Sequence, residues 1–414
     1  MLGVALLVLS TGPTAALEFG KLNASPEDVG LSSARLARAT ELLRKHLDAG
    51  EIAGAVGAVA RGGKVVYLET VGWQDVAAKT PMQSDTVFRI FSMTKPMTAV
   101  AAMRLVERAE LQLSDPVSKY IPEFANAAVL VDSSNPDTSG TRPPSRPILV
   151  KDLLLHTDGL SHRWSKLYRM RGVHSRKLTL AEVAVNVAKA PMMEDPGTHW
   201  RYGIGPTVLA RIVEVVSGKP YARYLEDEVL GPLGMSDTGY HVDTEQATRF
   251  ASLYRTTDEG GIEWQPEDPS IPYTEPPALF DGASNMLSTA PDYLRLGQML
   301  LGGGALDGTR VLSRKTIERM TVNHLPDELL PMQIQDSVFE GHGWGFGFGI
   351  IEDHRQPAMT VSNGEITWGG AAGTRFWVDP SEQMVTVLMV QILPHSAYAL
   401  GDRFKTAVYH AIVD

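Results

Sequence analysis

The sequence predicts an α+β fold in which an antiparallel sheet is flanked by helices and carries an inserted all-α region. Strand patterns occur near both ends of the chain, and the long middle alternates helical stretches with loops rich in Pro and Gly. A single sheet is therefore assembled from distant parts of the chain. We expect residues 17–90 plus 291–414 to form an α/β domain and residues 91–290 to form a mainly α-helical inserted domain.

The first strands are expected within residues 52–70, where apolar and β-branched residues lie on either side of Arg61-Gly62-Gly63-Lys64. Two such runs around a glycine turn are typical of a β-hairpin. Residues 86–91 form a strand-like lead-in to Ser92. Beyond Ser92, apolar residues recur at helical spacing, so a helix begins at or just after this serine.

The rest of the chain supplies the helices of the middle and the last strands. Helical stretches cover 180–190 and 206–216, strands cover 375–378 and 384–391 around a turn at 379–382, and an amphipathic helix covers 397–413. Residues 132–147 are rich in Ser, Pro, Asp and Gly, which indicates a surface loop that is either a disordered excursion or part of a substrate-access lid.

The composition narrows the possible partners and nucleophiles. A formal net charge of -10 over 414 residues, without a basic run, argues against nucleic acid or an anionic membrane surface and favours a small, uncharged substrate. The chain contains no cysteine, so a covalent nucleophile must be Ser, Thr, Lys or a carboxylate.

The N-terminus leaves the cellular location open. Residues 1–16 combine an apolar run with a small-residue end, as in a signal peptide, but no Lys or Arg precedes Lys21. The protein is therefore either cytoplasmic or exported to the periplasm or medium. No other run approaches the roughly 18 apolar residues that span a bilayer, so we expect no stable membrane insertion.

Ser92 and Lys95 are the first candidate catalytic pair. They lie three residues apart at a helix start, so the hydroxyl and the amine project from the same face. Free N–H groups and the positive end of the helix dipole would stabilise an oxyanion there. Alone, Ser-x-x-Lys is a weak signal, because a serine at this position is often only an N-cap.

The surrounding motifs make the chain resemble class C β-lactamases, family VIII carboxylesterases and penicillin-binding relatives. The resemblance covers roughly residues 25–410 and rests on motifs in the order of that superfamily: Phe91-Ser92-Met93-Thr94-Lys95-Pro96, Leu155-His156-Thr157-Asp158-Gly159-Leu160, Pro196-Gly197 with Trp200-Arg201-Tyr202, Pro232-Leu233-Gly234-Met235 and Ser288-Thr289-Ala290. It implies a β-lactamase/transpeptidase-like fold with the active site between the sheet and the helical region.

The resemblance also implies roles for residues far from Ser92. Tyr202 corresponds to the second catalytic element, which moves a proton between the serine and the leaving group. Lys95 either lowers the pKa of that phenol as an ammonium or accepts the serine proton as a neutral amine. The third element is Trp368-Gly369-Gly370, and the backbone N–H groups of Ser92 and Ala371 would form the oxyanion hole.

Two departures from the β-lactamase pattern bear on the substrate. Trp368 replaces the lysine of Lys-Thr-Gly, and Ile204 stands two residues after Tyr202 where β-lactamases have an asparagine. Both changes remove polar groups that hold a β-lactam, so we expect Trp368, Gly369, Gly370 and Ile204 to bind a carboxylic ester, with a short acyl chain. A β-lactamase, a D-amino-acid peptidase, an acyltransferase and a catalytically silent binding protein remain alternatives.

The sequence lacks the motifs of other classes of hydrolase. No Gly-x-Ser-x-Gly elbow and no His-Glu-x-x-His occurs, and the histidines are scattered. The sequence therefore implies neither a metal nor an organic cofactor. The expected partner is a small-molecule ester. The sequence does not fix the oligomeric state.

Overall fold

An eight-stranded antiparallel sheet forms the centre of the molecule, in the order β14-β15-β16-β17-β18-β1-β2-β3. The computed structural model describes residues 20–136, 139–163, 165–173, 175–355 and 360–414. The sheet and its flanking helices confirm the predicted α+β fold. The possible signal peptide, residues 1–16, lies outside the described residues.

The elements have the following bounds. The helices are α1 Ser33–Asp48, α2 Thr94–Glu107, α3 Val150–Leu155, α4 Lys166–Arg169, α5 Leu180–Lys189, α6 Gly205–Ser217, α7 Tyr221–Leu225, α8 Gly231–Leu233, α9 Ala290–Leu301, α10 Arg314–Met320 and α11 Leu400–Tyr409. The strands of the large sheet are β1 Gly54–Arg61, β2 Lys64–Asp75, β3 Thr80–Pro81, β14 His342–Trp344, β15 Gly349–Ile351, β16 Ile366–Gly369, β17 Arg375–Asp379 and β18 Met384–Val390. Short strands outside it are β4 Phe88–Arg89, β5 Val129–Leu130, β6 Thr141–Arg142, β7 Tyr254–Thr256, β8 Ile262–Trp264, β9 Leu287–Ser288, β10 Ala305–Leu306, β11 Thr309–Arg310, β12 Met332–Ile334, β13 Ser337–Phe339 and β19 Ile392–Leu393.

The predicted hairpin is present as β1 and β2. The two strands join through Gly62 and Gly63, whose φ angles of 56° and 77° lie in the left-handed region that glycine adopts without cost. Strand β1 is buried along its whole length and its side chains alternate between two cores. Val56 and Ala58 face one core and Ala55 and Val59 face the other, so both faces of the sheet are covered.

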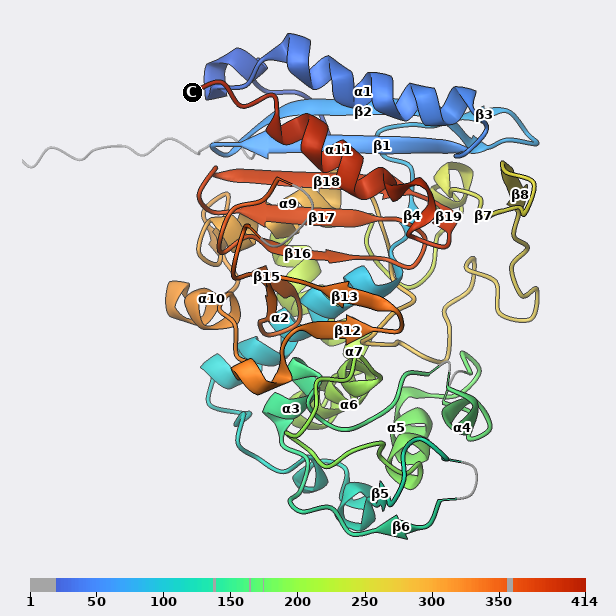
Figure 1. Cartoon of the computed structure of the whole chain (residues 1–414), viewed down its shortest axis with the longest axis vertical. Coiled ribbons are helices and arrows are strands. Elements are labelled where there is room, and N and C mark those ends of the chain that lie inside the picture. Colours follow the sequence, from blue (N-terminus) through green and yellow to red (C-terminus); the bar gives the residue numbers. More distant parts are fainter. Residues whose placement is uncertain (1–19, 137–138, 164, 174, 356–359) are drawn as a thin grey trace, which may run out of the picture.

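Helices α1 and α11 cover one face of the sheet, and α9 covers the other (Figure 1). Helix α11 approaches β1 so closely that a Cβ at Gly57 would lie 2.7 Å from the ring of Phe404. The predicted helix over 397–413 is confirmed in its middle. A short 3₁₀ turn, Ala397–Ala399, precedes it and the helix ends at Tyr409.

The helical region continues the core of the α9 face. Helices α2, α3, α5, α6 and α7 share one hydrophobic core with α9 and the sheet, and they form the lower half of the molecule in Figure 1. The predicted stretches 180–190 and 206–216 are confirmed as α5 and α6. Short strands also occur between residues 115 and 290. The sequence shows few strand signals there because these strands pair over only two or three residues.

A buried ionic cluster attaches α11 to the sheet. Lys405 forms an ion pair with Glu365, and both side chains are completely buried. The hydroxyl of Tyr409 lies 2.5 Å from Glu365 and 2.8 Å from Asp379. Burial raises the pKa of Glu365 to about 7, while Lys405 and the hydroxyl of Tyr409 act in the opposite direction.

Candidate active site

Ser92 lies where a short strand turns into helix α2. Strand β4 pairs with β9, and the N–H of Ile90 donates to the carbonyl of Met286 at 3.0 Å. Phe91 then has a φ of 44°, a conformation that costs a non-glycine residue about 1–3 kcal/mol. Ser92 follows in the 3₁₀ turn Phe91–Met93, and α2 itself begins at Thr94, two residues after the serine. The sharp bend places Ser92 on the wall of a cleft.

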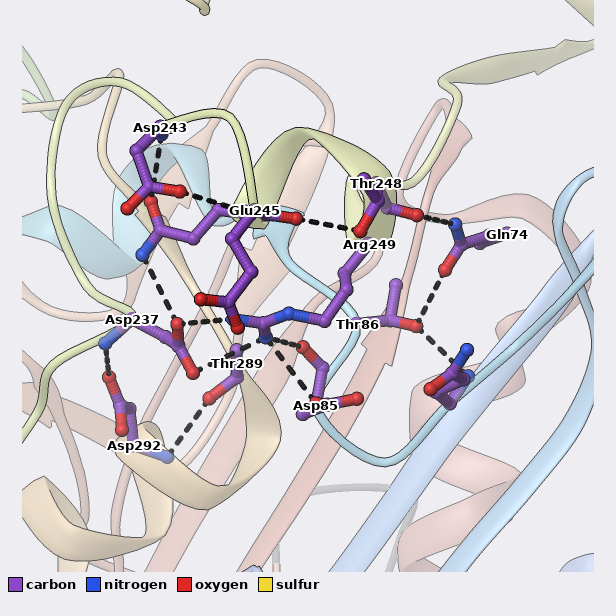
Figure 2. Close-up of polar contacts among 12 residues, drawn as sticks. Gln74, Asp85, Thr86, Asp237, Asp243, Glu245, Thr248, Arg249, Thr289 and Asp292 are labelled. Carbon is purple, nitrogen blue, oxygen red and sulfur yellow. Dashed lines mark hydrogen bonds and ion pairs between the residues drawn. The ribbon is translucent and has the colours of Figure 1, made fainter.

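The segment before Ser92 is anchored to the loop that contains Arg249 (Figure 2). The Arg249 guanidinium forms an ion pair with Asp237 at 2.7 Å and donates to the carbonyl of Asp85 at 2.6 Å. The N–H of Asp237 in turn donates to the Asp292 carboxyl at 2.9 Å, in the first turn of α9. These bonds connect three distant segments, so they fix the path of the chain toward the nucleophile.

Lys95 is held against Ser92 in a buried position. Its Nζ donates to the Ser92 Oγ at 3.1 Å and to the carbonyl of Ala283 at 2.9 Å, and the residue is 3% exposed. Burial, followed by the charge of Arg163, holds the pKa of Lys95 well below its usual range, although Asp281 opposes this. The amine is therefore suited to accept a proton near neutral pH.

Tyr202 completes the group around the serine. The Nζ of Lys95 lies 4.5 Å from the centre of the Tyr202 ring, and the indole Nε1–H of Trp368 donates to the phenolic oxygen at 3.0 Å. Burial raises the pKa of Tyr202 to about 12, while hydrogen bonds with Ser92 and Trp368 act in the opposite direction. The phenol is therefore protonated near neutral pH and can donate a proton.

An aromatic cluster fixes the orientation of the Tyr202 ring. The rings of His156, Trp344 and Trp368 lie with their centres 4.7, 6.2 and 5.3 Å from that of Tyr202. The N–H of Gly203 donates to Nδ1 of His156 at 3.3 Å, and burial holds the pKa of His156 well below its usual range. His156 is therefore a neutral structural residue behind the tyrosine, as its loop position suggests.

Strand β16 and the following turn approach Ser92 through two glycines. A Cβ at Gly370 would lie 2.5 Å from the carbonyl oxygen of Ile90, so only glycine fits here without movement of the backbone. The next residue, Ala371, is exposed in a turn that lines the cleft. Of the acceptors in the described part of the chain, none receives its N–H, so this group can donate to a bound oxyanion.

Ile204 is not brought to the cleft with the other candidates. It is 1% exposed, belongs to the hydrophobic core and precedes the first turn of α6. Its backbone N–H donates to the carbonyl of Ser161 at 3.2 Å. The structure therefore gives no support for substrate contact by the Ile204 side chain, because the backbone at Gly203 and Ile204 turns inward to begin the helix.

The cleft has a volume of about 1030 Å³ and brings together Ser92, Lys95, Tyr202, Trp368, Gly369, Gly370 and Ala371. It also contains residues that the sequence did not suggest, among them Arg163, Tyr273, Phe339 and Arg375. These come from loops, a hairpin and a neighbouring strand outside the motifs. Only their position in the folded chain identifies them.

A family model described as Beta-lactamase matches residues 39–410. Among curated proteins, Protein Rv1367c of Mycobacterium tuberculosis is 34% identical over 85% of this chain and 89% of its own length. Esterase EstB of Burkholderia gladioli is 30% identical over 90% of this chain and 94% of its own length. Among solved structures, EstCE1, described as a hydrolase with promiscuous acyltransferase activity, superposes with a TM-score of 0.77 at 28% identity and covers 92% of this chain and 99% of its own.

None of the described helices is long and apolar enough to cross a membrane. Likewise, the described ranges contain no group of three or more His, Cys, Asp or Glu side chains arranged to hold a metal ion.

Proposed function

Because the chain belongs to the beta-lactamase family of serine hydrolases, we propose that it cleaves carboxylic esters through an acyl-enzyme formed on Ser92. The observation that carries this proposal is the buried Lys95 amine, 3.1 Å from the Ser92 hydroxyl. The similarity to Esterase EstB over nine-tenths of the chain supports an ester as the substrate. The absence of a lysine at Trp368 supports it against a β-lactam.

In the first half of the reaction, Ser92 Oγ attacks the ester carbonyl and its proton passes to the neutral Nζ of Lys95. The backbone N–H groups of Ser92 and Ala371 hold the oxyanion. When the C–O bond breaks, the Tyr202 hydroxyl gives its proton to the departing alkoxide and receives the proton that Lys95 holds. An alcohol leaves, and the acyl group stays on Ser92.

In the second half, water attacks the acyl-enzyme and the proton transfers run in the opposite sense. The water proton reaches Lys95 through Tyr202, and Ser92 Oγ recovers a proton as the carboxylic acid leaves. We propose short acyl chains because the rings of Tyr202, Trp368 and Phe339 lie against one another in the wall of the cleft that also contains the serine. The distance between the Trp368 and Phe339 ring centres is 5.9 Å.

Acyl transfer to an alcohol is the second candidate function. A cleft of about 1030 Å³ is larger than a short ester requires, so an acceptor alcohol could occupy the remainder. EstCE1 is described as having such an activity beside hydrolysis. Measuring the ratio of ester to free acid formed from one donor, at increasing alcohol concentration, separates transfer from hydrolysis.

The test of the main proposal is the mass of the intact protein after incubation with a short-chain 4-nitrophenyl ester or a fluorophosphonate. We expect one acyl or phosphonyl adduct, mapped to Ser92, and no adduct and no turnover in Ser92→Ala. Turnover that persists in the purified Ser92→Ala variant contradicts the proposal. If the wild-type protein binds the ester but never forms an adduct, it is the catalytically silent alternative. If it turns over a chromogenic cephalosporin in preference to the ester, it is a β-lactamase.

A further inference from the structure

The cleft carries positive charge in a protein that is negative overall. The chain has a formal net charge of -10, yet the charged residues that line the cleft, apart from the neutral Lys95, are five arginines and only two carboxylates. A cleft of one sign with low-dielectric walls concentrates ligands of the opposite sign. This charge distribution favours a substrate that bears an anionic group.

Three of these arginines already have carboxylate partners: Arg89 pairs with Glu267, Arg163 with Asp281 and Arg201 with Glu194. Arg176 lies over the ring of Tyr273 and donates to the carbonyl of Ile271 at 3.0 Å. The three paired arginines help to shape the wall and their charges are largely satisfied, whereas Arg176 has no ion pair within the described residues and its buried Nε and Nη2 have no hydrogen-bond partner.

Arg375 differs from the other arginines of the cleft. Within the described residues its guanidinium makes neither a hydrogen bond nor an ion pair, although the residue is half-buried. Burial lowers the pKa of Arg375, although the charge of Asp402 on α11 opposes this. An arginine remains protonated nonetheless, so its guanidinium keeps five donors available for a ligand.

The sheet register explains how a residue of β17 reaches the cleft. Arg375 pairs with Gly369 across β16 and β17. Its side chain passes over Gly369, where a Cβ would lie only 2.8 Å from the Arg375 Cδ. Strand β15 pairs with β16 only as far as Thr367, so the edge of β16 beyond that residue is open. Arg375 therefore lines the same cleft as the turn at Gly370 and Ala371.

We propose that Arg375 binds a carboxylate of the substrate, so that the preferred esters carry a free carboxylate in the acyl or alcohol part. This inference rests on the proposed esterase function and names its substrate class. A guanidinium binds a carboxylate through two parallel N–H bonds, which fixes the orientation of the ligand as well as its position. Gly369 leaves room for this contact, because it has no side chain between Arg375 and the open strand edge.

The test compares mono-4-nitrophenyl glutarate, which carries a free carboxylate, with its methyl ester, in which that carboxylate is blocked and neutral. In the wild type we expect a higher kcat/KM for the anionic ester. Arg375→Gln should lower the ratio of the two kcat/KM values about 10- to 100-fold, the effect of one lost charge-assisted hydrogen bond. Arg375→Lys, which keeps the charge, should recover part of the ratio. Arg403→Gln on α11 removes an exposed arginine outside the cleft and should leave the ratio unchanged.

The outcomes separate this inference from the proposed function. If the wild type hydrolyses the neutral ester and Arg375→Gln does not change the ratio, the carboxylate site is wrong and the esterase stands. If neither ester acylates Ser92, the proposed esterase function is wrong. Calorimetric titration with glutarate then tests the carboxylate site separately. Glutarate binding that is lost in Arg375→Gln and kept in Arg403→Gln supports the site; equal binding by Arg375→Gln and the wild type overturns it.

Discussion

Replacing Trp368 by Phe tests whether this residue acts on the proton chemistry as well as forming a wall. The substitution keeps a flat apolar ring but removes the indole N–H that donates to the Tyr202 oxygen at 3.0 Å. That hydrogen bond opposes the effect of burial on the Tyr202 pKa, so its loss should raise this pKa further. A neutral hydrogen bond contributes about 0.5–1.5 kcal/mol, and one to a charged group about 1.5–3 kcal/mol. If the phenolic oxygen gains negative charge as it protonates the leaving group, we expect kcat/KM to fall about 10- to 100-fold.

The assay is kcat/KM for a neutral 4-nitrophenyl ester over pH 6–10, with single-turnover measurement of the acylation step. Trp344→Phe is the matched control. Its indole N–H donates to the carbonyl of Leu154 at 2.9 Å, so it also loses an indole hydrogen bond next to Tyr202, but not one to the phenolic oxygen. An unchanged rate in Trp368→Phe, or an equal loss in Trp344→Phe at equal thermal stability, refutes a direct effect on Tyr202.

Two further predictions concern the proton groups and stability. Lys95→Ala and Tyr202→Phe should each reduce kcat by orders of magnitude, and the double variant should lose little more, because the two side chains act as one unit; a double loss equal to the product of the single losses contradicts this. Burial raises the pKa of Asp292 to about 7, so the native state binds its proton more tightly than the unfolded chain does. The free energy of unfolding should therefore decrease as the pH rises from about 4 to about 7. Asp292→Asn should remove this part of the decrease, which is measured as thermal unfolding midpoints over that pH range. Parallel pH profiles for the wild type and the variant would show that Asp292 is not responsible.

The sequence predicted the fold and the elements that carry short-range patterns. The hairpin of β1 and β2 was predictable because Gly62 and Gly63 mark its turn and apolar and β-branched residues mark its strands. The approach of Ser92, Lys95 and Tyr202 was predictable only through motifs, because 107 residues separate Lys95 from Tyr202.

Three features of the site depend on the packing of the whole chain and had no local signal. Ile204 is an apolar residue at a motif position, and an apolar residue there suits a pocket wall and a core position equally. The chain turns inward to begin α6, and Ile204 is therefore buried in the core. The donation from Trp368 to Tyr202 requires the relative placement of the sheet and the helical region. The low pKa of Lys95 results from burial beside Arg163, whose segment contains no recognisable pattern.

The expectation of an uncharged substrate illustrates why a motif is an incomplete description of a cleft. This expectation follows from the identity of residue 368 and from the net charge. Neither of these depends on which residues become neighbours in the folded sheet. In an antiparallel sheet, however, each residue also has a neighbour across the strand, and Gly369 pairs with Arg375. A cation that is missing from β16 is then supplied from β17, at the open edge where the substrate would lie. The two arguments predict opposite preferences for esters that differ only by a carboxylate, so the glutarate pair measures directly whether strand register or motif identity determines selectivity here.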